Sequence, residues 1–108
     1  MRTVAVLVVL GSLIALGSSP TVAQSFTVKG AVECADFVLE HENNNYRAMN
    51  QWWVLGYITG RNMATGTHSG KGVGADAIYA FALSYCRNNP YGDNEDAARA
   101  AYDVFNFQ

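Results

Sequence analysis

The strongest constraint on the fold is a pair of cysteines, Cys34 and Cys86, the only two in a chain of 108 residues. Two cysteines allow a single intramolecular pairing. A bond between them closes a loop of about 53 residues, and the reduced entropy of the unfolded chain stabilises the fold by roughly 4 kcal/mol. Because both cysteines fall on apolar faces of the helices expected below, we predict a Cys34–Cys86 disulfide. Two free buried thiols are the alternative.

The first 23 residues have the three-part layout of a secretory signal peptide. Arg2 supplies a positive start, an apolar run extends from Val4 to Leu16, and small and turn residues lead to Ala23. The run is shorter than the ~20 residues that a membrane-spanning helix needs. We therefore expect cleavage after Ala23 and export to the periplasm or the medium, where a disulfide persists. An uncleaved N-terminal anchor is the alternative.

The remaining residues, 24–108, are expected to form one domain. Removal of Arg2 leaves six Lys and Arg against nine Asp and Glu, a net charge of −3. Binding to nucleic acid or to an anionic membrane surface calls for clustered basic residues. The charge therefore argues against both as partners once the signal peptide is removed.

Hydrophobic periodicity predicts four helices, over about residues 31–42, 46–63, 75–88 and 94–105, and no segment alternates as a strand does. Three asparagines after the first helix favour local hydrogen bonds over helix continuation. Asn89-Pro90 ends the third helix, and Asp93 or Asn94 caps the fourth. The predicted fold class is all-α: a small four-helix domain closed by one disulfide.

The second predicted helix contains an uninterrupted apolar block, residues 52–58. The pattern is too long for a buried strand, so we expect a central helix that is buried on most sides. Gly56 and Gly60 lie one turn apart on a face shared with Trp53 and Tyr57. Each glycine costs about 1 kcal/mol in a helix. We therefore expect these two glycines to form a notch into which another helix packs.

Four glycines between residues 65 and 74 predict a flexible surface loop. Gly66 and Gly70 precede Lys71, but their spacing is one residue too short for a phosphate-binding loop. Gly72 also stands where a hydroxyl residue would bind magnesium. No phosphate site is therefore expected here.

Residues suited to catalysis or metal binding are scattered. His41 lies between Glu40 and Glu42, whereas His68 lies in the glycine-rich loop. No histidine pair has helical i, i+4 spacing, and no third metal ligand is evident. We therefore predict a protein that is not an enzyme and holds no metal or cofactor. Convergence of Glu40, His41 and His68 in one cleft would favour catalysis instead.

Large aromatic side chains are the remaining candidates for function. Adjacent helical residues point about 100° apart, so Trp52 and Trp53 cannot lie flat on one surface. We expect one in the core and the other partly exposed, with both in the core as the alternative. Trp52, Trp53, Phe81 and Phe105 are the predicted protein-binding residues. The expected partners are other proteins, including a second copy of the chain.

An ordered set of motifs resembles a known family. Cys34-x-x-Phe37 comes first, Trp52-Trp53 with Gly56-Tyr57 follows, and Tyr85-Cys86-Arg87-Asn88-Asn89-Pro90 comes last. This order is similar to that of the HdeA/HdeB-type periplasmic acid-stress chaperones. The resemblance implies a short helical domain that loosens in acid and exposes apolar surface to unfolding client proteins. The chain departs from those lysine-rich proteins in having only Lys29 and Lys71 in residues 24–108.

A second resemblance competes with the first. Gly56-Tyr57-Ile58-Thr59-Gly60, followed by the Cys86-to-Pro90 helix end, is similar to Tai-type periplasmic immunity proteins. That likeness implies a small disulfide-containing binder of one toxic amidase, with the glycine-rich loop as the inserted element. A structural or stress protein without either activity is the third alternative.

Overall fold

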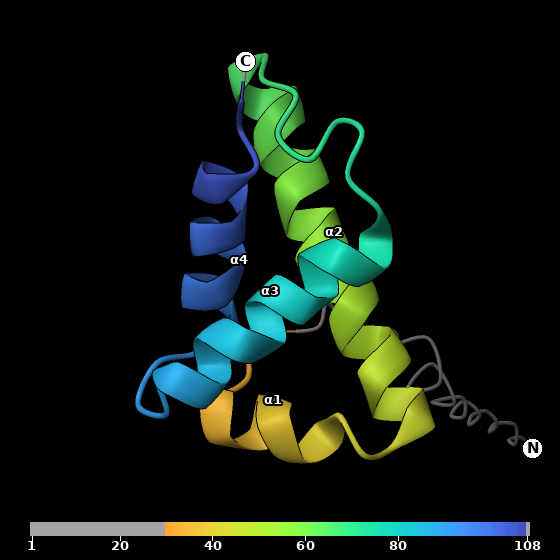
Figure 1. Cartoon of the computed structure of the whole chain (residues 1–108), viewed down its shortest axis with the longest axis vertical. Coiled ribbons are helices and arrows are strands. Elements are labelled where there is room, and N and C mark those ends of the chain that lie inside the picture. Colours follow the sequence, from red (N-terminus) through yellow and green to blue (C-terminus); the bar gives the residue numbers. More distant parts are fainter. Residues whose placement is uncertain (1–29, 108) are drawn as a thin grey trace, which may run out of the picture.

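The architecture is an all-α domain of four helices, seen in a computed structural model that describes residues 30–107 (Figure 1). The helices are α1 (Cys34–Glu40), α2 (Asn44–Thr65), α3 (Ala75–Asn88) and α4 (Asn94–Val104). All four predicted helices are confirmed. The predicted signal peptide, residues 1–23, and the first residues of the predicted exported domain lie outside the described residues.

The first helix is shorter than predicted because the chain before it pairs with the start of α4. The Val32 N–H donates to Asn94 Oδ1 at 2.8 Å, and the Asn94 N–H donates to the Val32 carbonyl at 2.9 Å. An isolated antiparallel bridge joins Glu33 to Asp93. These contacts hold residues 32 and 33 extended, so α1 begins only at Cys34.

The second helix is longer than predicted, and its ends follow from capping. The Asn43 side chain accepts hydrogen bonds from the N–H groups of Asn45 and Tyr46, so α2 begins at Asn44. Gly66 ends it in the left-handed region with a φ of 71°, which glycine adopts without a steric penalty. Of the three asparagines expected to break the helix, Asn43 does so as its cap, and the other two belong to α2.

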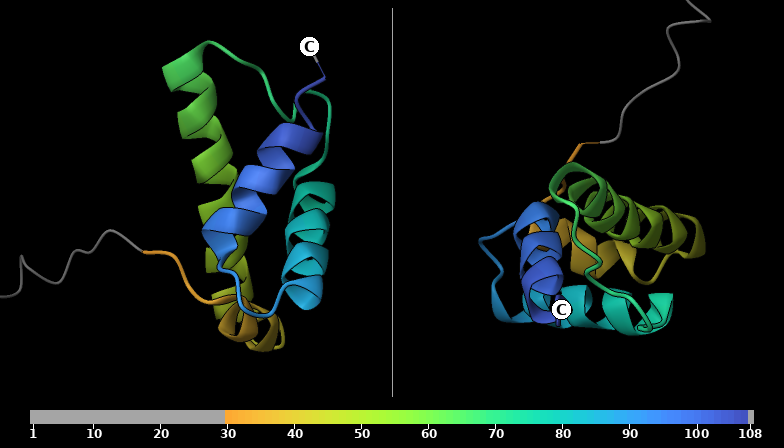
Figure 2. Two further views of the ribbon diagram at one scale, coloured as in Figure 1. Left: turned by 90° about the vertical axis from the view of Figure 1, so that its left-hand side faces the viewer. Right: turned by 90° about the horizontal axis from the view of Figure 1, so that it is seen from above.

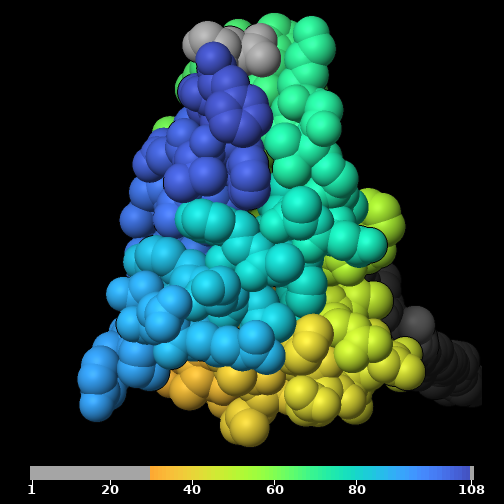
Figure 3. Space-filling model, viewed as in Figure 1, coloured from red at the N-terminus to blue at the C-terminus, as the bar shows by residue number. Residues whose placement is uncertain are grey.

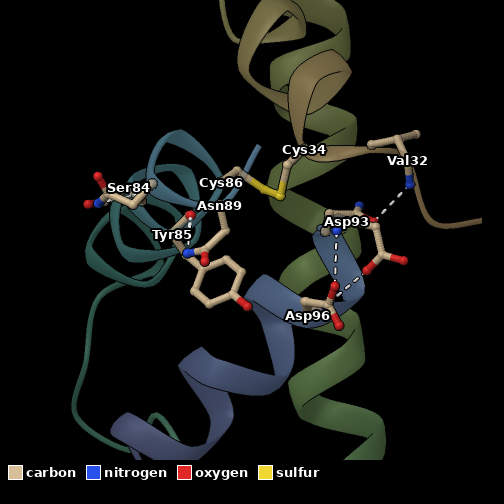
Figure 4. The surroundings of a disulfide bond; sticks show 10 residues. Val32, Cys34, Ser84, Tyr85, Cys86, Asn89, Asp93 and Asp96 are labelled. Atoms are coloured by element: carbon tan, nitrogen blue, oxygen red, sulfur yellow. Dashed lines mark hydrogen bonds between the residues drawn. A yellow bond between two sulfur atoms is a disulfide. The ribbon is translucent and has the colours of Figure 1, made fainter. Parts of the chain in front are cut away.

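The disulfide Cys34–Cys86 joins the first residue of α1 to the last turn of α3, with the two Cα atoms 4.8 Å apart (Figure 4). Both half-cystines are buried. Near it, Asp93 and Asp96 form a capping box at the start of α4, in which each side chain accepts the other residue's N–H. The bond and the cap therefore fix three chain segments at one end of the molecule.

The core lies where α3 meets the other three helices. It contains Cys34, Phe37, Val54, Ile58, Ile78, Tyr79, Ala82, Leu83, Cys86, Ala97, Ala98, Ala101 and Tyr102. The contribution of α4 is mostly alanine, and small side chains let a helix approach its neighbours closely. In both views of Figure 2, α3 and α4 lie on the same side of α2. The prediction that α2 is buried on most sides is wrong: only Asn50, Val54 and Ile58 of this helix are fully buried, although Trp53, Leu55 and Tyr57 also pack against the core.

Candidate functional site

Of the four predicted binding residues, one is exposed and three are half-buried. Trp52 points away from the core, and 70% of its surface is exposed. Trp53 is half-buried against the core, with its ring 6.0 Å from that of Tyr57. Phe81 of α3 and Phe105 are also half-buried and meet edge to face, with ring centres 5.6 Å apart. Trp52 is therefore the predicted binding residue that is most available to a partner.

The predicted helix-packing notch at Gly56 and Gly60 is wrong for the described part of the chain. Both glycines are exposed, and a Cβ atom built on either one would meet no heavy atom within 4 Å. The physical reason is that α2 turns Val54 and Ile58 toward α3 and α4, which directs Gly56 and Gly60 outward. Each glycine still costs about 1 kcal/mol of helix stability relative to alanine, and residues 30–107 supply no compensating contact.

The glycines belong to a continuous exposed surface that we call the outer face of α2. It consists of Met49, Trp52, Gly56, Thr59, Gly60 and Met63, all of which are exposed. Their spacing of three or four residues places them on one side of the helix. Met49 and Met63 expose 47% and 81% of their surface. The outer face thus presents three large apolar side chains around two glycines.

The outer face carries no charge. The sequence of α2 contains two charged residues, Arg47 and Arg61, and the side chain of each contacts another part of the same chain. Arg47 Nη1 donates to the His41 carbonyl at 2.7 Å, and the Arg61 guanidinium lies 4.2 Å from the centre of the Tyr102 ring. An exposed helix normally presents charged residues to water. Uncharged aromatic and methionine surface is instead typical of the centre of protein interfaces.

The predicted catalytic candidates do not converge. His41 Nδ1 lies 2.8 Å from the hydroxyl of Tyr79, whose pKa is raised chiefly by burial. Glu40 accepts a hydrogen bond from Asn50 at 2.8 Å. His68 lies beyond the opposite end of α2, and the 22 residues of this helix span roughly 33 Å. Glu40 and His41 are therefore far from His68.

The glycine-rich loop, which the sequence predicts to be a flexible surface loop, makes hydrogen bonds to the rest of the fold. Asn62 Oδ1 accepts from the Ser69 N–H at 2.9 Å, and buried Ser69 Oγ donates to the Tyr102 carbonyl at 2.6 Å. The Gly70 N–H donates to the Phe105 carbonyl at 2.9 Å, so the loop lies beside the C-terminal residues (Figure 3). These hydrogen bonds connect the loop to the end of α2, to α4 and to Phe105.

Tyr102 anchors the same region through its hydroxyl. Its oxygen lies 2.6 Å from Thr67 Oγ1 and 3.3 Å from Thr65 Oγ1. Hydrogen bonds from these two threonines, Thr65 first, lower the pKa of Tyr102, and the nearby positive charge of Arg61 adds to the effect. The end of α2, the loop and α4 are thereby joined in one polar network.

Comparison with protein-family models, with curated proteins and with solved structures finds no match for this chain. The resemblances to HdeA/HdeB-type and Tai-type proteins therefore stay predictions from sequence motifs.

Residues 30–107 contain no pocket and no group of three or more side chains suited to a metal ion. None of the helices described above is long and apolar enough to cross a membrane.

Proposed function

We propose that this chain is an exported protein-binding module that holds apolar segments of other polypeptides on the outer face of α2. The observation that carries the proposal is that this face is exposed, apolar and uncharged over four turns of helix. Contiguous exposed apolar surface of this kind marks interaction sites in soluble proteins. Trp52, at its middle, has the size and exposure of an interface anchor. The proposal includes no catalytic step.

The clients we propose are proteins that unfold in acid. Near pH 2, the nine acidic side chains are largely neutral, because ordinary carboxyl pKa values are about 3.9–4.3. Six Lys and Arg and two His then leave residues 24–108 at +8. Repulsion among these charges opposes close packing, while the disulfide limits expansion. Half-buried Trp53, Phe81 and Phe105 would then add to the apolar surface that Trp52 already offers.

The test is aggregation of an acid-sensitive periplasmic protein at about pH 2.5, with and without the exported chain. We expect the wild-type protein to suppress light scattering and Trp52→Ala to suppress it less. The matched control is Tyr91→Ala, which removes a fully exposed aromatic side chain from the turn before α4. Suppression by neither the wild type nor any variant, at up to a fivefold molar excess over the client, would contradict the proposal.

Tryptophan emission provides a second readout of the same experiment. Trp53 is half-buried and Trp52 is exposed, so loosening in acid should shift the emission of Trp53 toward longer wavelength. The Trp52→Ala variant should retain most of this shift. An emission spectrum that stays unchanged down to about pH 2 would mean that the packing around Trp53 does not respond to acid.

A specific binder of the Tai type is the second candidate, and the fastened loop favours it. Ser69 of the loop donates hydrogen bonds to Asn62 Oδ1 and to the Tyr102 carbonyl, and a preformed surface loses little entropy on binding. Such a protein should form a tight one-to-one complex with a toxin near neutral pH and protect no client in acid. Affinity capture at pH 7, followed by stoichiometry from sedimentation, separates the two candidates.

A further inference from the structure

Two arginines from different helices reach the same tyrosine hydroxyl where α2 packs against α4 (Figure 1). Arg61 Nη1 of α2 lies 3.5 Å from the Tyr57 hydroxyl oxygen, at the long limit of a hydrogen bond. Arg99 of α4 also hydrogen-bonds to Tyr57, and this bond is the first cause of the raised pKa of the Arg99 side chain. Neighbouring positive charges repel each other, and a neutral hydroxyl does not offset that repulsion. We call Arg61, Arg99 and Tyr57 the arginine cluster.

Arg61 is oriented by aromatic rings but is not paired with an acid. Its guanidinium carbon lies 4.2 Å from the centre of the Tyr102 ring and 6.0 Å from the centre of the Tyr57 ring. Within residues 30–107, Arg61 forms no ion pair, and the long contact with Tyr57 is the one hydrogen bond of its side chain. A guanidinium has five N–H donors in a fixed fork. Most of these donors are therefore left for a ligand.

The ring that supports Arg61 is fixed in turn. Tyr102 is buried, and its hydroxyl oxygen lies 2.6 Å from Thr67 Oγ1 and 3.3 Å from Thr65 Oγ1. Because the supporting ring cannot turn freely, Arg61 loses little side-chain entropy when it binds a ligand. A charged group that is held in place in this way suits recognition better than a mobile surface arginine does.

We propose that the arginine cluster binds a carboxylate group, which Arg61 holds from α2 and Arg99 holds from α4. The planar guanidinium fork matches the two oxygens of a carboxylate, and such charge-assisted hydrogen bonds are stronger than those between neutral groups. A bound carboxylate also offsets the repulsion between the two arginines. The inference goes beyond the proposed function, because the ligand is charged and the cluster lies on the side of α2 that meets α4.

The charges around the cluster favour a carboxylate over a phosphate group. Arg99 pairs with Glu95 at 3.3 Å and with Asp96 at 3.2 Å, and these side chains are partly exposed. Exposed pairs of this kind contribute little to stability, so Arg99 can turn toward a ligand without a large penalty. The two acids nevertheless reduce the positive charge near the cluster. A ligand with one negative charge therefore fits better than a phosphate with nearly two.

Polypeptides offer a carboxylate in two forms, the C-terminal group and the side chains of Asp and Glu. Three acetylated tripeptides separate these sources: trialanine with a free carboxylate, trialanine amide, and an amidated tripeptide with one central glutamate. Near pH 6.5 the first and third are ionised, because their carboxyl pKa values are about 3.3–4.3. Inorganic phosphate is the fourth probe.

The measurement is titration of the exported chain with each probe, followed by the NMR signals of the arginine Nε–H groups. We expect a saturable shift of the Arg61 and Arg99 signals with at least one of the two ionised peptides. The dissociation constant should be on the order of 1 mM, as for a small ligand held by a few hydrogen bonds. Trialanine amide should cause no saturable shift.

Variants then assign the binding to the cluster. Arg61→Gln should weaken binding at least tenfold, and Arg61→Lys, which keeps the charge but loses the fork, should weaken it several-fold. Arg99→Gln is a second, independent variant at an exposed position of α4. The matched control is Arg87→Gln, which removes the same charge from the last turn of α3, and it should change binding less than about twofold. Circular dichroism verifies the fold of every variant.

A saturable shift that needs Arg61 and Arg99 but not Arg87 would support the proposal, and the peptide that binds would identify the source of the carboxylate. No saturable shift with either ionised peptide up to about 20 mM would overturn it. Equal binding of trialanine amide would also overturn it, as would equal weakening by Arg87→Gln. Tighter binding of phosphate than of both ionised peptides would overturn the choice of a carboxylate. None of these results depends on whether the chain protects a client in acid.

Discussion

Replacement of Asn94 by alanine tests the contact that closes the fold near the disulfide. Asn94 is fully buried at the start of α4, and its Oδ1 accepts the Val32 N–H at 2.8 Å. Alanine would leave this N–H without a partner, and an unsatisfied buried donor costs about 1–3 kcal/mol. Asn94 Nδ2 has no hydrogen-bond partner among the described residues, so its removal offsets part of that loss. We expect a net loss of about 1–2 kcal/mol in the free energy of unfolding.

For a domain of this size, such a loss lowers the melting temperature by about 4–8 °C per kcal/mol. The assay is thermal and urea unfolding of the oxidised chain followed by circular dichroism, together with hydrogen exchange at the Val32 amide. Asn88→Ala is the matched control, because that exposed side chain bonds only within α3, to the Ser84 carbonyl. Its effect should stay below about 0.5 kcal/mol. Equal effects of the two substitutions, with unchanged exchange at Val32, would refute the reasoning.

Three further predictions concern the disulfide, the cap of α4 and the outer face. Joint replacement of Cys34 and Cys86 by alanine should lower the free energy of unfolding by about 4 kcal/mol, and a loss below about 1 kcal/mol in urea unfolding would count against it. The Asp93 N–H donates to Asp96 and lowers the pKa of that carboxyl below its ordinary 3.8. The stabilisation is therefore present above pH 3.8 and is lost as the pH falls through the lower folded pKa, so Asp96→Asn should reduce the melting temperature at pH 7 and flatten its decline in acid. Gly56→Ala should raise the free energy of unfolding by about 1 kcal/mol, because a Cβ atom at this position meets no neighbour within 4 Å, and a destabilised variant would mean that this position is covered.

Helix positions follow from local signals, and those signals are strong in this chain. Asn43 and the Asp93–Asp96 pair cap α2 and α4 with bonds that span three residues or fewer. Proline after Asn89 ends α3. Such interactions depend on neighbouring residues, and the sequence predicts the cap of α4 and the end of α3. It predicts the break at the three asparagines as well, but it places the start of α2 two residues late, because Asn43 alone acts as the cap. The start of α1 instead depends on the pairing of Val32 with Asn94, across 62 residues, and the prediction placed that start too early.

The orientation of α2 could not be predicted in the same way. Residues 52–58 are apolar on every side of the helix, so the periodicity favours Trp53 and Tyr57 as strongly as Val54 and Ile58. Packing against α3 and α4 determines which of these two faces of α2 is buried, and the alanines of α4 allow the helices to approach closely. The position of the glycine-rich loop likewise depends on the hydrogen bond from Ser69 Oγ to the Tyr102 carbonyl. These residues are 33 positions apart, so no local sequence pattern predicts that bond.

The disulfide divides the described chain into a covalent ring and a tail. Residues 34–86 form the ring, which contains α1, α2 and most of α3, whereas α4 lies entirely on the tail that follows Cys86. The bond limits how far the helices of the ring can separate, but it places no such limit on α4, which is held by packing and hydrogen bonds. When those contacts weaken, α4 can separate without breaking the covalent ring, and its separation would uncover the sides of α2 and α3 that it packs against. Among the four helices, α4 is thus the one that the disulfide does not hold to the others.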